Sequence, residues 1–311
     1  MTRPIRLHMG PREWAMLVLL SILWGGAFFL IDVAVELVPP FTLVFLRVTI
    51  AASVLLVVLR ATGRPWPFER RTIVPFLTLA LLNNVVPFCL FAWGQQQIAS
   101  GLASILNATT PLWAVLVAHF LTTDEKATPL KVAGVAIGFA GVALMIGGDL
   151  LLDIGGAGLL AQLACVVATL SYALAGVHAR RFRLMGISPI GVSAGTLGAA
   201  VPVMLVLVLL FEPTSLGAMP PAEAIASILA LALFSTALAF ILYFRLIESA
   251  GATNAILVTF LIPVTAILLG ATLLGEVLAP RHFIGMALIA AGLALIDGRI
   301  FARHGAAPTT A

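Results

Sequence analysis

The sequence predicts an all-α integral membrane protein, with ten transmembrane helices arranged as two inverted-topology repeats of five helices around a central cavity. Of the 311 residues, 61% are hydrophobic and only 10% are charged, and the mean hydropathy is +1.14. In soluble domains roughly a quarter of the residues are charged, so this composition excludes a soluble protein. Apolar stretches of spanning length recur along the chain, and several Glu, Pro and Gly residues repeat at a nearly constant spacing.

Ten apolar segments are long enough to cross a bilayer, and turn residues or charges separate them. The first segment follows three arginines but is longer than the apolar part of a signal peptide, so we expect it to remain as a membrane helix. The expected spans are residues 13–35, 41–60, 73–96, 99–121, 129–147, 157–179, 188–211, 223–246, 252–274 and 282–298.

The internal repeat divides the chain into two halves. Pro111 matches Pro263 at a spacing of 152 residues, and at a spacing of 151 the matches are Glu125 with Glu276, Pro129 with Pro280, Gly134 with Gly285 and Gly141 with Gly292. We expect a first repeat at 13–147, an external linker at 148–156 and a second repeat at 157–298, with cytoplasmic tails at 1–12 and 299–311. Five helices per repeat is an odd number, so the second repeat starts on the opposite side of the membrane.

Positive charge predicts the orientation of the helices. Lys and Arg concentrate in cytoplasmic loops of membrane proteins. The segments on the same side of the membrane as the N-terminus hold 15 of the 17 Lys and Arg residues. Arg281 is alone in the opposite set, and Arg47 lies within a span. We therefore expect both termini in the cytoplasm and a multi-pass protein of the cytoplasmic (inner) membrane. The cytoplasmic set is Arg3, Arg6, Arg12, Arg60, Arg64, Arg70, Arg71, Lys126, Lys131, Arg180, Arg181, Arg183, Arg245, Arg299 and Arg303.

Two membrane helices carry a central proline at matching positions. Pro111 has no N–H to bond the Asn107 carbonyl, and Pro263 stands in the same relation to Thr259. Within a membrane, such a gap is tolerated where protein groups or a water-filled cavity satisfy the backbone. Interrupted helices at corresponding positions of two halves indicate a substrate site between them. The sequence therefore predicts a small-molecule transporter that works by alternating access.

Polar and aromatic side chains on these helices are candidates to contact the substrate. Asn84, Phe88, Phe91 and Gln95 are spaced by four, three and four residues, so they share one helix face; the alternative for the amides is hydrogen bonding between helices. Trp24 and Tyr172 match at a spacing of 148 and lie too deep for an interfacial belt. The full candidate set is Trp24, Asn83, Asn84, Phe88, Phe91, Gln95, Asn107, Thr110, Pro111, Tyr172, Tyr243, Thr259 and Pro263.

Asp32 and Arg47 are the charged residues placed well inside the expected spans. An arginine at mid-helix is costly unless it is paired or hydrated. The two residues are therefore candidates for a buried ion pair between the first two helices, and a free Arg47 is a candidate to hold a substrate carboxylate. Histidines without ligand spacing and two cysteines within apolar segments predict neither a metal site nor a disulfide.

Several short motifs resemble a known family. These are the WGGAFF run at Trp24–Phe29, the Pro111 segment, LGE at Leu274–Glu276, and Pro280 followed by Gly285. Together they resemble the drug/metabolite transporter superfamily, and within it the ten-helix EamA-type exporters, similar to bacterial aromatic amino-acid exporters. The resemblance covers about residues 13–297 and implies a basket of ten helices around a central cavity. It further implies efflux of amino acids or related metabolites.

Other functions remain as alternatives. The same superfamily translocates drug-like, lipid-linked or nucleotide-linked sugar substrates, but phosphates call for several basic residues, and Arg47 is the one basic residue well inside the expected spans. A membrane enzyme is a distant alternative, because GxSxG and HExxH motifs are absent from the sequence. We expect no cofactor and no nucleic-acid partner; the expected partners are a small-molecule substrate and the lipid bilayer, with the chain a monomer or weak homodimer.

Overall fold

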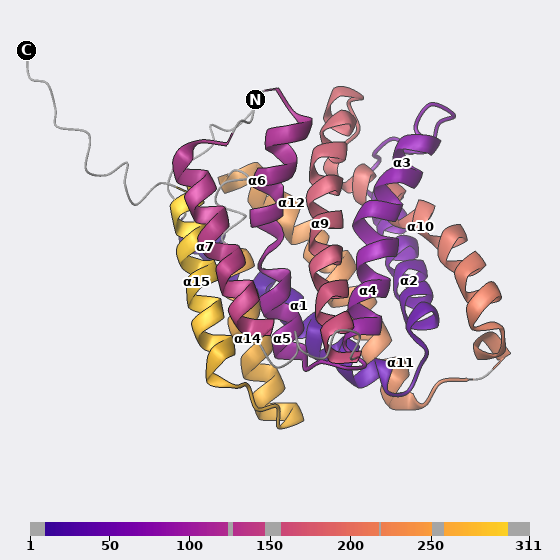
Figure 1. Cartoon of the computed structure of the whole chain (residues 1–311). Coiled ribbons are helices and arrows are strands. Elements are labelled where there is room, and N and C mark those ends of the chain that lie inside the picture. The colour runs from indigo at the N-terminus through magenta and orange to yellow at the C-terminus, as the bar shows by residue number, and fades with distance from the viewer. Residues whose placement is uncertain (1–9, 124–126, 147–156, 218, 251–257, 298–311) are drawn as a thin grey trace, which may run out of the picture.

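The structure is a computed structural model that describes residues 10–123, 127–146, 157–217, 219–250 and 258–297. These residues form a bundle of helices, with no strand among them (Figure 1). The expected linker at 148–156, Glu125 and most of both tails lie outside the described residues.

Helices occupy nearly all of the predicted spans. Seven are long and apolar enough to cross a membrane, and three shorter apolar helices cover Pro129–Leu144, Leu261–Leu274 and Pro280–Ile296. The first half contains α1 (Pro11–Val35), α2 (Pro40–Ala61), α3 (Ile73–Ala80), η1 (Leu81–Val85), α4 (Val86–Gly94), α5 (Ser100–Asn107), α6 (Thr110–Leu121) and α7 (Pro129–Ile146). The second half contains α9 (Ala157–Leu184), α10 (Pro189–Phe211), η2 (Pro213–Gly217), α11 (Ala222–Ala230), η3 (Leu231–Leu238), α12 (Ala239–Ala250), α14 (Val258–Leu269), η4 (Gly270–Leu274) and α15 (Pro280–Asp297).

Proline fixes where many of these helices begin. Pro11, Pro40, Pro129, Pro189 and Pro280 are each the first residue of a helix. At this position the fixed φ of proline suits the helix, and its missing N–H has no intrahelical partner in any case. The matched prolines of the two repeats therefore begin equivalent helices, α7 and α15.

Two of the three described π-helical segments lie at equivalent places, η1 after α3 and η3 after α11. In η1 the backbone hydrogen bonds run five residues back, as from the Val86 N–H to the Leu81 carbonyl. The residue five places after Leu82 is Pro87, which has no N–H, and the Ser171 hydroxyl of α9 donates to the Leu82 carbonyl at 2.7 Å. In η3 the Thr236 hydroxyl donates to the Leu231 carbonyl, five residues earlier, at 2.8 Å. Such segments are frequent at functional sites, and the sequence analysis did not foresee them.

The two central prolines have different effects on their helices. Around Pro111 the helix ends at Asn107 and restarts at Thr110, whose hydroxyl donates to the Asn107 carbonyl at 2.8 Å. The expected break at Pro263 is wrong, because Pro263 lies inside the continuous helix α14. At a spacing of 152 residues, Thr110 corresponds to Ile262. Ile262 carries no hydroxyl, so it cannot donate a hydrogen bond to the carbonyl three residues earlier as Thr110 does.

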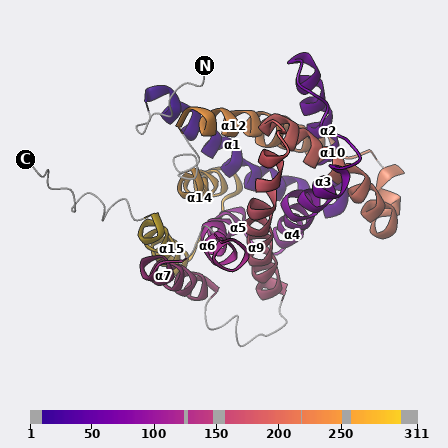
Figure 2. The same ribbon diagram turned by 90° about the horizontal axis from the view of Figure 1, so that it is seen from above.

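The main helix contacts of one half have equivalents in the other half. α1 packs on α14, and its counterpart α9 packs on α5 and α6. α1 also packs on α11 and α12, as α9 packs on α4. Two further pairs, α2 with α10 and α7 with α15, are each made of equivalent helices (Figure 2).

Glycines allow α7 and α15 to approach closely. A Cβ at Gly134 would lie 2.5 Å from the Gly292 carbonyl oxygen, and a Cβ at Gly141 would lie 2.6 Å from the Gly285 oxygen. The contacts run in opposite directions along the two helices, so the pair is antiparallel. The glycine stripe on α7 therefore serves contact within the chain, as expected for small residues in membrane helices.

Two carboxylates cap helix N-termini at the end of the bundle where α1 ends. Glu276 accepts hydrogen bonds from the backbone N–H groups of Ser100 (2.7 Å) and Gly101 (3.0 Å), which begin α5. Glu212 accepts from the N–H of Phe41 (3.0 Å) and of Thr42 (2.7 Å), near the start of α2. A carboxylate at a helix N-terminus pairs with free N–H groups and with the helix dipole. The LGE motif thus ties the connection after η4 to α5.

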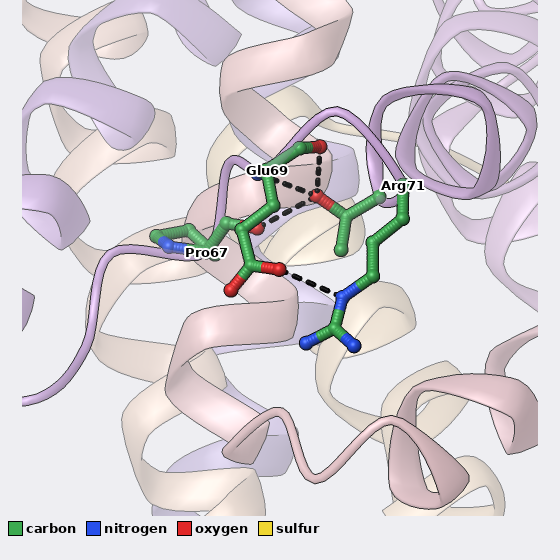
Figure 3. Close-up of polar contacts among 4 residues, drawn as sticks. Pro67, Glu69 and Arg71 are labelled. Atoms are coloured by element: carbon green, nitrogen blue, oxygen red, sulfur yellow. Dashed lines mark hydrogen bonds and ion pairs between the residues drawn. The ribbon is translucent and has the colours of Figure 1, made fainter.

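At the opposite end, the connection between α2 and α3 is held by its own polar groups (Figure 3). The Thr72 hydroxyl donates to the Pro67 carbonyl at 2.8 Å and accepts from the Glu69 N–H at 2.9 Å. Arg71 and Glu69 form an exposed ion pair at 2.7 Å, which contributes at most about 1 kcal/mol.

Candidate functional site

A cavity of about 300 Å³ lies between the two halves of the chain. Its walls come from α1, α2, η1, α4, α5 and α6 of the first half, and from α9, η3, α12 and α14 of the second. The volume is at the lower end of the range for small-molecule sites. The lining residues are Trp24, Ala27, Phe28, Ile31, Arg47, Asn83, Phe88, Phe91, Asn107, Thr110, Tyr172, Ser235, Thr236, Phe240, Tyr243, Thr259 and Ile262.

Many of these residues are repeat equivalents of one another. At the 152-residue spacing of the central prolines, first-half lining residues match second-half lining residues from helix to helix. The cavity is therefore built from corresponding faces of the two repeats. The pairs are Asn83 with Ser235, Phe88 with Phe240, Phe91 with Tyr243, Asn107 with Thr259, and Thr110 with Ile262.

Aromatic rings make up much of the wall. The Trp24 and Tyr243 rings lie 5.3 Å apart between centroids and are tilted by 49°. Phe91 contacts Phe28 edge-on at 5.6 Å and stacks on Tyr172 at 6.4 Å. Contacts of this kind hold the rings in place, because aromatic pairs prefer offset or edge-to-face arrangements at 4.5–7 Å. The wall thus offers flat apolar surface, with hydroxyl and indole N–H groups at its edges.

Arg47 brings a positive charge to the same cavity. It is 6% exposed, its Nε donates to the Thr236 hydroxyl at 3.0 Å, and its guanidinium lies 3.9 Å above the Phe88 ring centroid. The ion pair with Asp32 that we considered is not formed. Arg47 instead lines the cavity, and among the described residues no carboxylate pairs with it. This leaves the second alternative, in which Arg47 holds a substrate carboxylate.

Asp32 lines a different pocket, which we call the end pocket. This polar pocket of about 340 Å³ is lined by Asp32, Val35, Glu36, Gln95, Gln96 and Gln97. Gln95 is buried, and its Nε2 donates to the Phe28 carbonyl at 2.7 Å. Gln95 therefore lines the end pocket and not the cavity, and its hydrogen bond reaches the backbone of Phe28, whose side chain lines the cavity.

Three further candidates lie outside the cavity lining. Asn84 is fully buried, and neither its Oδ1 nor its Nδ2 has a hydrogen-bond partner. It follows Asn83 in η1, but only Asn83 lines the cavity. Pro111 and Pro263 are also buried and do not line the cavity, whereas the residues before them, Thr110 and Ile262, do. Of the 13 candidates proposed as substrate contacts, the structure brings together Trp24, Asn83, Phe88, Phe91, Asn107, Thr110, Tyr172, Tyr243 and Thr259.

Several lining residues of the second half were not among the candidates predicted from the sequence. Ser235 and Phe240 are the repeat equivalents of Asn83 and Phe88, so applying the 152-residue spacing to the third span would have found them. Thr236 was less accessible to such reasoning, because its equivalent is Asn84, which lies outside the cavity. The sequence gives no signal that Thr236 bonds to Arg47.

Fold and cavity together define a polytopic helical membrane protein with a small-molecule-sized chamber between two similar halves. The comparison with known families agrees, since residues 12–147 and 159–297 each match the EamA-like transporter family. The chain belongs to this family, within the drug/metabolite transporter superfamily, and it contains the family domain twice.

Similar proteins are also named as transporters. The chain is 29% identical over 283 residues to the uncharacterized inner membrane transporter YedA of Escherichia coli (strain K12), covering 89% of this chain and 88% of YedA. It is 26% identical to the uncharacterized transporter YoaV of Bacillus subtilis (strain 168), covering 89% and 94%. A solved structure titled "Crystal structure of protein" has the same fold, with a TM-score of 0.66 and 22% identity over 95% of this chain and 99% of that one. The protein is a membrane transporter.

Proposed function

We propose that the protein is a secondary transporter that exports amino acids, including aromatic or bulky apolar ones, or related small metabolites by alternating access. The carrying observation is the cavity of about 300 Å³, whose aromatic wall includes rings from both repeats. Small polar groups on η1, η3, α5 and α6 interrupt this wall. Apolar pockets with a few placed polar groups are typical of small-molecule sites.

The packing pattern supports two repeats of inverted topology. The contact of Gly134 with Gly292 becomes the contact of Gly285 with Gly141 when the repeats are exchanged. Because these helices are antiparallel, the two-fold axis that relates them runs across the helices, as expected for an axis in the membrane plane. Rocking one repeat against the other around the shared cavity would then open it to each side in turn.

Orientation follows from the distribution of charge. With both termini in the cytoplasm, the Lys- and Arg-rich connections face the cytoplasm and the end pocket faces outward. The direction of transport, from inside to outside, comes from the EamA resemblance. Phosphate-bearing substrates such as nucleotide-linked sugars are less favoured, because among the described lining residues Arg47 alone carries a positive charge.

A substrate screen in proteoliposomes tests this proposal, with uptake of radiolabelled tryptophan, phenylalanine and leucine as the readout. Trp24→Ala removes an aromatic wall residue, and we expect transport at low substrate to fall by at least about tenfold, since aromatic truncations in binding pockets often cost 2 kcal/mol or more. Trp93→Ala is the matched control, because Trp93 is 40% exposed and outside the lining. Absence of amino-acid transport, or equal activity of both variants, would contradict the proposal.

A further inference from the structure

The guanidinium of Arg47 is held in a fixed position by groups from both repeats. Phe88 of α4 lies under its plane, with 3.9 Å from Cζ to the ring centroid. Thr236 of η3 accepts from its Nε at 3.0 Å, and the same Thr236 hydroxyl donates to the Leu231 carbonyl at 2.8 Å. The hydroxyl proton is thus committed to Leu231, which leaves a lone pair of the oxygen for Arg47. This geometry sets both the tilt and the rotation of the guanidinium.

The charge of Arg47 is not balanced by any described carboxylate. Among the described residues the ion pair that the structure contains is Arg71 with Glu69, at one end of the bundle. Asp32 lines the end pocket instead of the cavity, and no ion pair joins it to Arg47. A buried positive charge without a partner is costly and commonly marks a functional site in a membrane protein.

The unused part of the guanidinium has the geometry that a carboxylate needs. Arginine has five N–H donors in a planar fork, and Thr236 takes the one on Nε. The four N–H groups on the two Nη atoms have no acceptor among the described residues, and Arg47 lines the cavity. Two parallel N–H···O bonds to one carboxylate are the preferred arrangement for such an edge.

We propose that Arg47 is the carboxylate subsite of the transporter and that it selects for substrates with a carboxylate attached to an apolar or aromatic body. Thr236 and Phe88 are positioning residues that aim the Nη edge into the cavity. This inference rests on the proposed function for the location of the site, and it adds the chemical class of the substrate. A neutral amide of the same shape would leave the charge of Arg47 unpaired and bind more weakly.

Binding to the purified protein in detergent tests the subsite without requiring transport. The probes are 3-phenylpropionate and its neutral isostere 3-phenylpropanamide, together with phenylalanine and phenylalaninamide, measured by calorimetry. We expect each acid to bind about 10- to 100-fold more tightly than its amide, as for hydrogen bonds to charged groups. Arg47→Met keeps the packing on Phe88 and should bring the ratio close to one. Equal binding of acid and amide by the wild-type protein, or binding of neither acid, would overturn the proposal.

Substitutions at Thr236 provide a second test. Its readout is the ratio of acid binding to amide binding, and misfolding would weaken the binding of both. Thr236→Val removes the acceptor for Nε and should lower the acid-to-amide ratio by about tenfold, whereas Thr236→Ser keeps the hydroxyl and should restore it. Thr49→Val is the matched control, because the Thr49 hydroxyl bonds to the Phe45 carbonyl of its own helix at 2.7 Å. A ratio unchanged in Thr236→Val would contradict the positioning role.

The outcomes separate this inference from the proposed function. If proteoliposomes transport phenylalaninamide as well as phenylalanine, the transporter proposal stands and the carboxylate subsite is wrong. If 3-phenylpropionate binds in an Arg47-dependent manner while no amino acid is transported, the subsite stands and the amino-acid proposal is wrong.

Discussion

The substitution Gly134→Ala tests how the fifth helix of each repeat is held. Gly134 of α7 is buried against α15, and an added Cβ would lie 2.5 Å from the Gly292 carbonyl oxygen and 2.9 Å from Cγ1 of Ile296. The nearest of these atoms belongs to the backbone of a helix, so it cannot swing aside as the end of a flexible side chain can. The two helices must therefore separate locally.

The size of this effect follows from the contact distances. Ordinary contact begins at 3.4 Å, so the 2.5 Å approach requires a separation of about 0.9 Å, the difference between the two distances. Gaps of 0.5–1 Å forfeit roughly a quarter to a half of the dispersion energy of the atoms concerned. Overpacking of this kind costs about 1–3 kcal/mol, and the better helix propensity of alanine returns up to about 1 kcal/mol. We expect the free energy of unfolding to fall by about 1–2 kcal/mol.

Thermal unfolding of the purified protein in detergent measures this loss. For chains of this size the expected decrease in apparent Tm is about 2–8 °C. Gly176→Ala is the matched control, because Gly176 lies in α9 and a Cβ there would meet nothing within 4 Å; its Tm should stay the same or rise. By the repeat relation, Gly141→Ala should resemble Gly134→Ala. Equal stability of Gly134→Ala and Gly176→Ala would refute the close packing of α7 on α15.

Three further predictions concern groups at the ends and in the interior of the bundle. Glu276→Ala removes the carboxylate that accepts from Ser100 and Gly101, and the loss of two charge-assisted bonds should destabilise the protein by about 3 kcal/mol in the same thermal assay. Asn84→Leu replaces a buried amide without partners, so Tm should be unchanged or higher, and a lower Tm would show that the amide is satisfied. We expect uniport, because Asp32, the carboxylate well inside the expected spans, lines the end pocket and not the cavity. Accumulation in proteoliposomes should therefore be independent of an imposed pH gradient in both the wild type and Asp32→Asn; gradient-driven accumulation that this substitution abolishes would establish proton coupling through Asp32.

Much of the architecture was predictable because membrane spans are encoded locally. A helix that crosses the hydrocarbon core must satisfy the hydrogen bonds of its own backbone. The ends of an apolar run therefore lie near the ends of a helix. Pro129 and Pro280, for example, were predicted near the start of a span and are the first residues of α7 and α15. The matched residues also predicted that corresponding helices would share the site, and Asn107 and Thr259 both line the cavity.

The candidate site was predictable only in part, because facing directions depend on backbone register. Asn84 lies inside the π-helical segment η1, where one turn contains more residues than a turn of α-helix. Asn83, and not Asn84, therefore lines the cavity together with Phe88 and Phe91. A strict four-and-three spacing assumes an unbroken α-helix, and this assumption is what made Asn84 a candidate. Gln95 likewise lies at the end of the same helix, where its amide reaches the Phe28 carbonyl.

The sequence by itself determined that the chain lies in a membrane, where its helices begin and end, and that its halves are related. Those properties depend on composition and on spacings within one helix or between equivalent ones. The tertiary structure decided which polar groups meet. Arg47 bonds to Thr236, 189 residues away, because α2 packs against η3. Only the packed helices bring those two residues together.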